Sequence, residues 1–207
     1  VCERDVSNAF REVKKMGIPR IKRLLSGGLI TNYLCSSACR HCLYGSSPGW
    51  ENEYINMDMA EDIFSKVKSL GCREMHIGGG EPFLSPKLLL KVLRAAETVG
   101  IRINYIETNS SWYKNENKCI NTLKKIEQNG VDTLLISISP FHNEYIPFYK
   151  VKSVIKACQK AKINIFPWQQ QFFNEIDNFD DRKKHSLQEY REKYGDSYID
   201  ELPARFG

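Results

Sequence analysis

The alternation of apolar and polar positions along the middle of the chain predicts five short strands separated by helices. The strands are apolar and are expected over residues 29–34, 74–77, 101–107, 131–138 and 163–166. Apolar residues at helical spacing predict helices between them, over residues 57–70, 85–99, 118–128 and 144–161. Ser85-Pro86 is typical of a helix start, and Gly100 of a helix end. Five βα units in sequence predict an α/β fold with a parallel sheet and right-handed crossovers.

Both ends of the chain lack this strand and helix pattern. Residues 4–25 have apolar positions at helical spacing and basic residues on the other face, which predicts a helical appendage over residues 1–27 that ends at Gly27-Gly28. This appendage can pack over the open end of a barrel or dock an acidic electron donor, and both interpretations stay open. Residues 171–207 predict a polar helical tail, and no sixth strand is evident. We therefore expect a core over residues 28–170 with an appendage at each end.

Composition and charge narrow the class of protein. The 207 residues are 42% apolar and 27% charged, which is typical of a soluble globular domain. The 30 basic and 25 acidic residues are interleaved, so we expect no nucleic-acid partner, and no run of about 18 apolar residues predicts a membrane span. Seven cysteines without a secretion signal predict reduced thiols and a cytoplasmic protein. The start without Met and the abrupt end favour a piece of a longer protein.

The most informative stretch contains three cysteines within eight residues: Cys35, Cys39 and Cys42. Three thiolates this close can bind one metal centre and leave one position open, because iron–sulfur cubanes and tetrahedral zinc each take about four ligands. On a [4Fe–4S] cluster the open position can bind a substrate or cofactor. A zinc site would need a fourth ligand from His41, or from Cys72 and His76. Simple burial of the cysteines fits less well, because the loop is rich in Ser, Gly and Pro.

Other polar or glycine-rich segments follow the predicted strands at corresponding places. They are Gly78-Gly79-Gly80, Thr108-Asn109 and Ser137-Ile138-Ser139. Open and closed α/β barrels place their active sites at the carboxyl ends of parallel strands, where these segments and the cysteine loop should meet. Glycine suits a backbone that approaches a ligand closely, although a glycine run is also typical of a plain turn.

The combination of Cys35-x3-Cys39-x2-Cys42 with Gly79-Gly80-Glu81-Pro82 resembles the radical S-adenosylmethionine (radical SAM) superfamily. The resemblance implies a partial (βα)6 barrel in which the three cysteines hold a [4Fe–4S] cluster. It further implies that S-adenosylmethionine chelates the unique iron and that the Gly-Gly-Glu segment hydrogen-bonds its amino group. The implied reaction is reductive cleavage to methionine and a 5′-deoxyadenosyl radical, which abstracts hydrogen from an unidentified substrate.

The resemblance also implies further contacts to S-adenosylmethionine. His41 stands before the last cysteine, where the family usually has an aromatic residue whose backbone contacts adenine. Asn109 belongs to a segment that resembles the family's Thr-Asn-Gly, with Ser110 in place of glycine, and it can bind ligand or start a turn. Ser137 and Ser139 resemble positions that bind ribose or carboxylate, and alternate residues of a strand share one face. Serines satisfied within the strand are the alternative.

The substrate side is less defined by the sequence. His142 follows the fourth predicted strand and can act as a proton donor or substrate ligand, or lie as a solvated loop residue next to a capping Asn143. The resemblance implies a small-molecule or peptide substrate and a reductant such as flavodoxin or ferredoxin. Two alternatives stay open: a peptide-modifying radical SAM maturase, and a non-catalytic iron–sulfur or zinc module that senses redox state or binds a partner.

Overall fold

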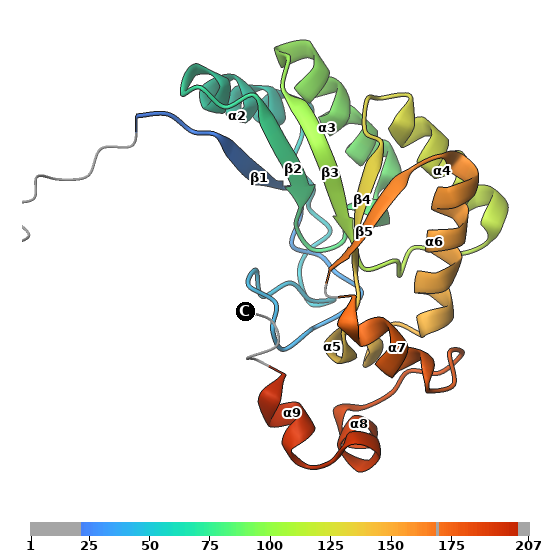
Figure 1. Ribbon diagram of the computed structural model, residues 1–207. Coiled ribbons are helices and arrows are strands. Elements are labelled where there is room, and N and C mark those ends of the chain that lie inside the picture. Colours follow the sequence, from blue (N-terminus) through green and yellow to red (C-terminus); the bar gives the residue numbers. More distant parts are fainter. Residues whose placement is uncertain (1–21, 169, 203–207) are drawn as a thin grey trace, which may run out of the picture.

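The computed structural model describes residues 22–168 and 170–202 and contains one five-stranded sheet (Figure 1). Its strands are β1 (Ser26–Ile30), β2 (Glu74–Gly78), β3 (Arg102–Thr108), β4 (Thr133–Ser137) and β5 (Asn164–Trp168). The order in the sheet is β1-β2-β3-β4-β5, and every neighbouring pair is parallel. The predicted α/β class with a parallel sheet is therefore confirmed.

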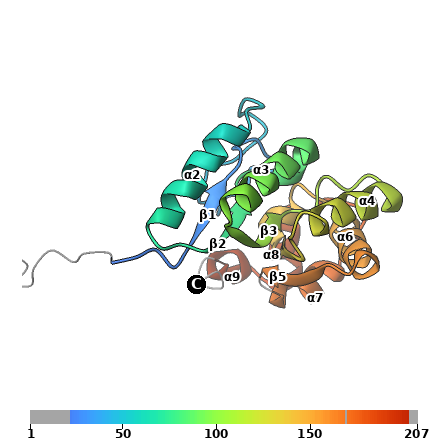
Figure 2. The ribbon, with the colours of Figure 1, turned by 90° about the horizontal axis from the view of Figure 1, so that it is seen from above.

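Four longer helices connect the strands: α2 (Met57–Ser69), α3 (Pro86–Val99), α4 (Glu116–Glu127) and α6 (Phe148–Ala161). Figure 2 shows them as an arc on the outer side of the sheet. Asn56 and Asn115 cap two of the helices, since their side-chain oxygens accept from Met59 N at 2.8 Å and from Lys118 N at 3.0 Å. Helix α3 begins at Pro86 and is capped at its C-terminal end by Gly100, which has a left-handed φ of 75°.

The helix predicted over residues 144–161 is wrong at its start. The segment forms a short helix, α5 (Pro140–Asn143), followed by α6, and Pro147 lies between them. Proline has no N–H to donate and disfavours helical backbone in the residue before it, so one helix cannot run through this position. Ser139 and Pro140 begin α5 instead, with the Ser139 side chain as the cap.

The first strand begins earlier than predicted. Gly27 and Gly28 lie within β1 rather than ending an appendage, and the chain leaves the strand after Ile30. A Cβ on Gly28 would lie 2.4 Å from Nε2 of His76, so this glycine lets the His76 ring lie across β1. The predicted N-terminal helices fall mostly on residues 1–21, which are outside the described residues.

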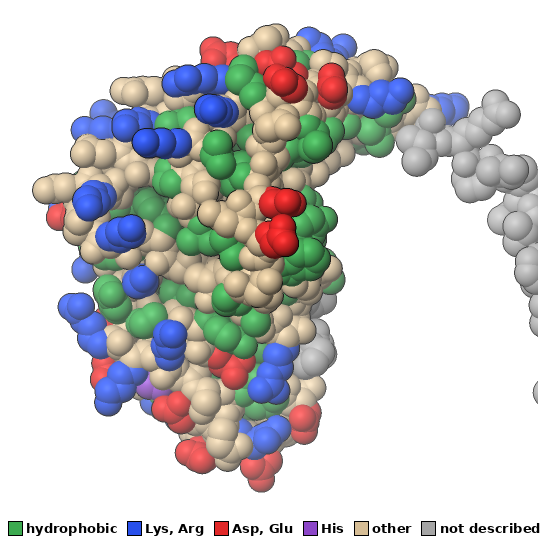
Figure 3. All heavy atoms as spheres, turned by 180° about the vertical axis from the view of Figure 1, so that it is seen from behind, with side chains coloured by type: hydrophobic (Ala, Val, Ile, Leu, Met, Phe, Trp, Pro, Cys, Tyr) green, Lys and Arg blue, Asp and Glu red, His purple; other side chains and the backbone are tan. Residues whose placement is uncertain are grey.

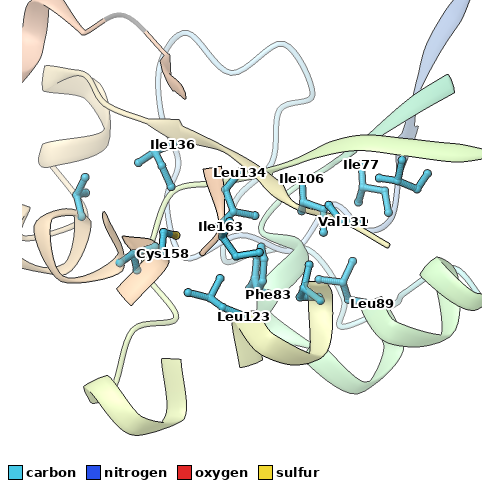
Figure 4. Packing of buried hydrophobic residues seen from close by; sticks show 14 of the residues in the cluster. Ile77, Phe83, Leu89, Ile106, Leu123, Val131, Leu134, Ile136, Cys158 and Ile163 are labelled. Atoms are coloured by element: carbon cyan, nitrogen blue, oxygen red, sulfur yellow. The ribbon is translucent and has the colours of Figure 1, made fainter. Parts of the chain in front are cut away.

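The main hydrophobic core lies between the sheet and the arc of helices (Figure 4). Ile77, Ile106 and Leu134 project from successive strands and are fully buried. They pack in one cluster with helix residues such as Leu89 and Leu123. Complete burial of one such side chain stabilises a fold by roughly 1.5–3 kcal/mol, so this layer holds the strands in place.

The C-terminal segment is helical, as predicted, but not polar throughout. It forms α7 (Gln171–Asp177), α8 (Leu187–Tyr194) and α9 (Ser197–Glu201). Their buried side chains join the main hydrophobic cluster, and they include Phe172, Ile176, Leu187, Tyr190 and Tyr198. Helices α7 and α8 both contact α5, so the tail packs against the end of the sheet where α5 lies. The described residues form no sixth strand.

On the surface, basic side chains are scattered among acidic ones over the face turned away in Figure 1, as Figure 3 shows. None of the helices in the described part of the chain combines the length and apolar composition that a membrane span requires.

Candidate active site

The cysteine loop follows β1 and forms much of the wall of a cavity of about 460 Å³. Backbone hydrogen bonds shape the loop, from Cys35 N to Ser47 O at 3.1 Å and from Cys42 N to Cys39 O at 3.0 Å. All three cysteines of the motif are free thiols, and all three line this cavity. The short loop therefore brings three sulfur ligands to one space.

The electrostatics of these thiols fit a cationic metal centre. Burial, with a smaller contribution from nearby negative charge that includes Cys42, raises the pKa of Cys35 to about 11 and that of Cys39 to about 12. Nearby thiolates repel one another in a poorly solvated site, and bound iron removes this penalty because it carries positive charge. The donor set thus fits a [4Fe–4S] cluster, in which each thiolate binds its own iron.

A mononuclear zinc site receives less support from the geometry. Of the candidate fourth ligands, only His41 lines the cavity. Cys72 donates to Glu74 O at 3.2 Å, and the His76 ring stacks on Tyr105 with centroids 4.8 Å apart. Among residues 22–168 and 170–202, no three His, Cys, Asp or Glu side chains converge on a point suited to a single ion.

The glycines after β2 pack directly on the cysteine loop. Gly80 N donates to Asn32 O at 2.7 Å, and a Cβ on Gly80 would lie 2.1 Å from Leu34 O. Gly79 has a φ of 140°, and its Cβ would lie 2.7 Å from Asn32 O. Both glycines also line the cavity. The close approach that glycine permits is in this structure an approach to the backbone of the cysteine loop.

The Glu81 side chain is not part of the cavity wall and binds the backbone and side chains behind it. The residue is fully buried, and its carboxylate accepts from Phe83 N at 3.1 Å, Thr108 Oγ1 at 3.0 Å and Asn109 N at 2.7 Å. These bonds join the end of β2 to the end of β3. Burial raises the pKa of Glu81 to about 7, although the hydrogen bonds act to lower it.

Asn109 starts a turn, which is one of the two roles that the sequence left open. Its Oδ1 accepts from Ser111 N at 2.9 Å, which forms a turn, and Ser110 has a positive φ of 67° where the resembling motif has glycine. Its Nδ2 donates to the Cys35 sulfur at 3.2 Å. Asn109 therefore contacts a sulfur that is predicted to bind the cluster, and it also lines the cavity.

The two serines at the end of β4 lie differently with respect to the cavity. Ser137 is the last residue of β4 and lines the cavity, whereas Ser139 lies beyond the strand and does not belong to the cavity wall. Strand alternation ends with the strand, so it does not extend to Ser139. The Ser139 side chain instead caps α5 and lies 2.7 Å from Nδ1 of His142.

His41 and His142 meet at the cavity wall. Their ring centroids are 4.9 Å apart in an edge-on arrangement, and His41 also packs on Phe141. His142 lies half-buried in α5 and is not a solvated loop residue. Burial lowers its pKa to about 3 and keeps its ring neutral. If the Ser139 hydroxyl donates to Nδ1, the ring proton lies on Nε2. Asn143 does not cap a helix but donates to Ile146 O at 3.1 Å.

The cavity wall also contains residues that the sequence motifs did not indicate. They include Tyr44, Tyr105, Glu107 and Leu135. Position in the sequence could have indicated Glu107, because this residue directly precedes Thr108-Asn109 at the carboxyl end of β3.

The family model of the radical SAM superfamily matches residues 29–170. Among solved structures, native anSMEcpe with bound AdoMet matches with a TM-score of 0.53 and 18% identity, over 74% of this chain and 49% of that chain. HydG, a maturase of the [FeFe]-hydrogenase, matches with a TM-score of 0.53 and 14% identity, over 94% of this chain and 46% of that chain. This chain thus spans about half the length of these proteins, and the likeness shows the fold. No curated protein matches the sequence.

Proposed function

The chain belongs to the radical SAM superfamily, and from this premise we propose that it is an enzyme that holds a [4Fe–4S] cluster and cleaves S-adenosylmethionine reductively. Cys35, Cys39 and Cys42 would bind the cluster and leave one iron for S-adenosylmethionine. The observation that carries the proposal is the arrival of three free thiols, the Gly79-Gly80 backbone and Asn109 at one cavity. These groups come from the carboxyl ends of three neighbouring strands.

When bound, the cluster supplies one electron to the sulfonium, which yields methionine and a 5′-deoxyadenosyl radical that takes a hydrogen atom from the substrate. The chain's own residues would set the conditions for this chemistry. The loop from Cys35 to Cys42 fixes the positions of the thiolates. Asn109 donates to the Cys35 sulfur, and hydrogen bonds to ligand sulfur tune the reduction potential of iron–sulfur clusters.

S-adenosylmethionine would contact the groups that line the cavity: His41, Gly79, Gly80, Asn109 and Ser137. Glu81 and Ser139 would act behind them, because their side chains hold Asn109 and His142 in place. His142 would present its neutral Nε2–H to the bound ligand as a hydrogen-bond donor. A flavodoxin or ferredoxin would supply the electron in a reducing compartment such as the cytoplasm, and the substrate would be a small molecule or a peptide.

The test is cluster reconstitution with iron and sulfide in the absence of oxygen. Addition of S-adenosylmethionine and dithionite should give 5′-deoxyadenosine, quantified by mass spectrometry. A Cys35/Cys39/Cys42→Ala variant should fall to the protein-free background. A Cys119→Ala variant should keep the activity, because Cys119 is buried in α4 away from the cavity.

Two outcomes would contradict the proposal. Retention of zinc alone would remove the iron–sulfur premise. A [4Fe–4S] electron paramagnetic resonance signal that S-adenosylmethionine does not perturb, without cleavage, would favour the non-catalytic sensing or binding module.

A further inference from the structure

One side of the cavity wall lies outside the proposed cofactor contacts. It consists of Tyr44 from the cysteine loop, Tyr105 and Glu107 from β3, and Leu135 from β4. Two aromatic rings, one carboxylate and one aliphatic side chain are an unusual set for a structural wall, because an isolated carboxylate is costly to bury beside apolar groups.

The Glu107 carboxylate has a defined position. A Cβ on Gly78 would lie 2.7 Å from Oε2, so the carboxylate lies across β2 in the space that this glycine leaves. The Glu107 side chain is 27% exposed, and no donor in the described part of the chain hydrogen-bonds to it. Burial raises the pKa of Glu107, as expected for a carboxylate whose charge is poorly compensated.

The neighbouring titratable groups do not supply the missing positive charge. His76 is the nearest basic group, with Nε2 at 3.6 Å from Oε1 of Glu107, but burial lowers the pKa of His76 and favours the neutral ring. Burial also lowers the pKa of His142. No lysine or arginine is among the described residues that line the cavity.

The two tyrosines add aromatic surface beside this carboxylate. Tyr105 and Glu107 are alternate residues of β3, and they line the cavity together with Tyr44 from the cysteine loop. Tyr105 is held by stacking on His76 and by an edge-on contact with Phe166, whose ring centroid is 5.1 Å away. Aromatic faces next to a carboxylate bind organic cations by combined cation–π and ionic attraction.

We propose that Glu107, Tyr44 and Tyr105 form a substrate subsite for an organic cation, an ammonium or guanidinium group carried on an apolar body. This inference rests on the proposed function, since it assigns the substrate class of the same cavity. Glu107 accepts a charge-assisted hydrogen bond from the cation, and Leu135 and the tyrosine rings contact the apolar body. The competing assignment is that Glu107 serves S-adenosylmethionine, which is itself cationic.

The test uses the reconstituted protein with S-adenosylmethionine and without reductant. Three probes share one ring and differ in charge: tyramine, 4-ethylphenol and 4-hydroxyphenylacetate. Anaerobic calorimetry should show that tyramine binds about tenfold or more tightly than either of the others, which corresponds to the usual strength of a hydrogen bond to a charged group. Glu107→Gln should abolish this preference.

Two further variants make the result specific. Gly78→Ala should weaken tyramine binding as well, because it displaces the carboxylate without removing its charge. Glu74→Gln is the matched control, since Glu74 pairs with Arg102 at 3.6 Å and is not part of the cavity wall, and it should keep the preference. Equal binding of the three probes would overturn the inference, and so would a loss of S-adenosylmethionine affinity in Glu107→Gln with unchanged tyramine binding.

The same samples separate this inference from the proposed function. A cluster signal that responds to S-adenosylmethionine, without a preference for the cation, would overturn the subsite and leave the function standing. Glu107-dependent tyramine binding in a protein whose cluster ignores S-adenosylmethionine would support the subsite and contradict the function.

Discussion

Glu81 shows that a motif residue can serve a site without lining it. Its carboxylate accepts hydrogen bonds from the loop after β3, including the backbone N–H of Asn109 at 2.7 Å. The same Asn109 donates to the Cys35 sulfur. The residue type is visible in the sequence, but the direction of its side chain depends on contacts between residues 27 and 28 positions apart. Sequence patterns alone do not resolve such contacts.

The raised pKa of Glu81 leads to a prediction for the metal-free, reduced protein. The pKa of Glu81 is about 7 in the folded protein and 4.5 for an exposed glutamate in the unfolded chain. Between these two pH values the folded state therefore binds more protons than the unfolded state. The contribution of Glu81 to stability is therefore fully present below about pH 4.5 and is lost as the pH rises through about 7. Glu81→Gln should cost more stability at pH 5 than at pH 8, measured by urea denaturation.

The reverse trend would mean that the hydrogen bonds to the Glu81 carboxylate outweigh its burial. Glu74→Gln provides the comparison, because it removes a carboxylate at a partly exposed position at the start of β2, the strand that precedes Glu81. Subtraction of the two pH profiles isolates the effect of burial.

At the scale of elements, the predicted strands and helices follow hydrophobic periodicity closely, whereas the connections do not. The break at Pro147 separates α5 from α6, and α5 brings His142 to the cavity. The tail was predicted as polar helix, but Tyr190 and Tyr198 are buried in it. Tyrosines at helical spacing are compatible with an exposed or a buried face, and only tertiary packing decides between them.

The contact between the tail and α5 is expected to hold His142 in place. Tyr190 donates from its hydroxyl to Oδ1 of Asn143 at 2.7 Å, and both residues are buried. Tyr190→Phe leaves this acceptor without its partner, which should cost about 1–3 kcal/mol in the free energy of unfolding. Hydrogen exchange should become faster at the amides of α5.

Tyr194→Phe is the matched control for this effect. The Tyr194 hydroxyl donates to Glu175 O at 2.7 Å, within the tail itself. Its loss should reduce stability without faster exchange in α5. Equal exchange in α5 for both variants would show that the tail does not position this helix.

At the scale of the whole molecule, the sequence could predict where the site lies but not all of what lines it. The carboxyl ends of parallel strands meet at one edge, so the cysteine loop, Gly79-Gly80 and Asn109 could be brought together from strand order alone. The side chains of β3 that line the cavity could not be predicted in this way, because the pairing of β2 with β3 shifts register between Met75 and Ile77. Two successive residues of β3, Asn104 and Tyr105, are therefore only partly buried, and strict alternation misplaces the side chains around them.

Removal of the cluster should act on this edge of the molecule and leave the rest unchanged. The loop over residues 31–50 has little regular structure, and burial and neighbouring negative charge raise the pKa values of two of its thiols, Cys35 and Cys39. A ligand that binds only the native loop stabilises it by mass action. Anaerobic hydrogen exchange with mass spectrometry should therefore show slower exchange over residues 31–50 and 79–81 in the reconstituted protein than in the metal-free protein.

Helices α4 and α6 provide the internal reference, because their contact is formed by buried residues such as Leu123 and Val154 and does not involve the cavity. Their exchange should be the same in both samples. A uniform change over the whole chain would place the effect of the cluster on global folding rather than on the loop. Unchanged exchange over residues 31–50 would show that the thiols already hold their binding geometry before iron arrives.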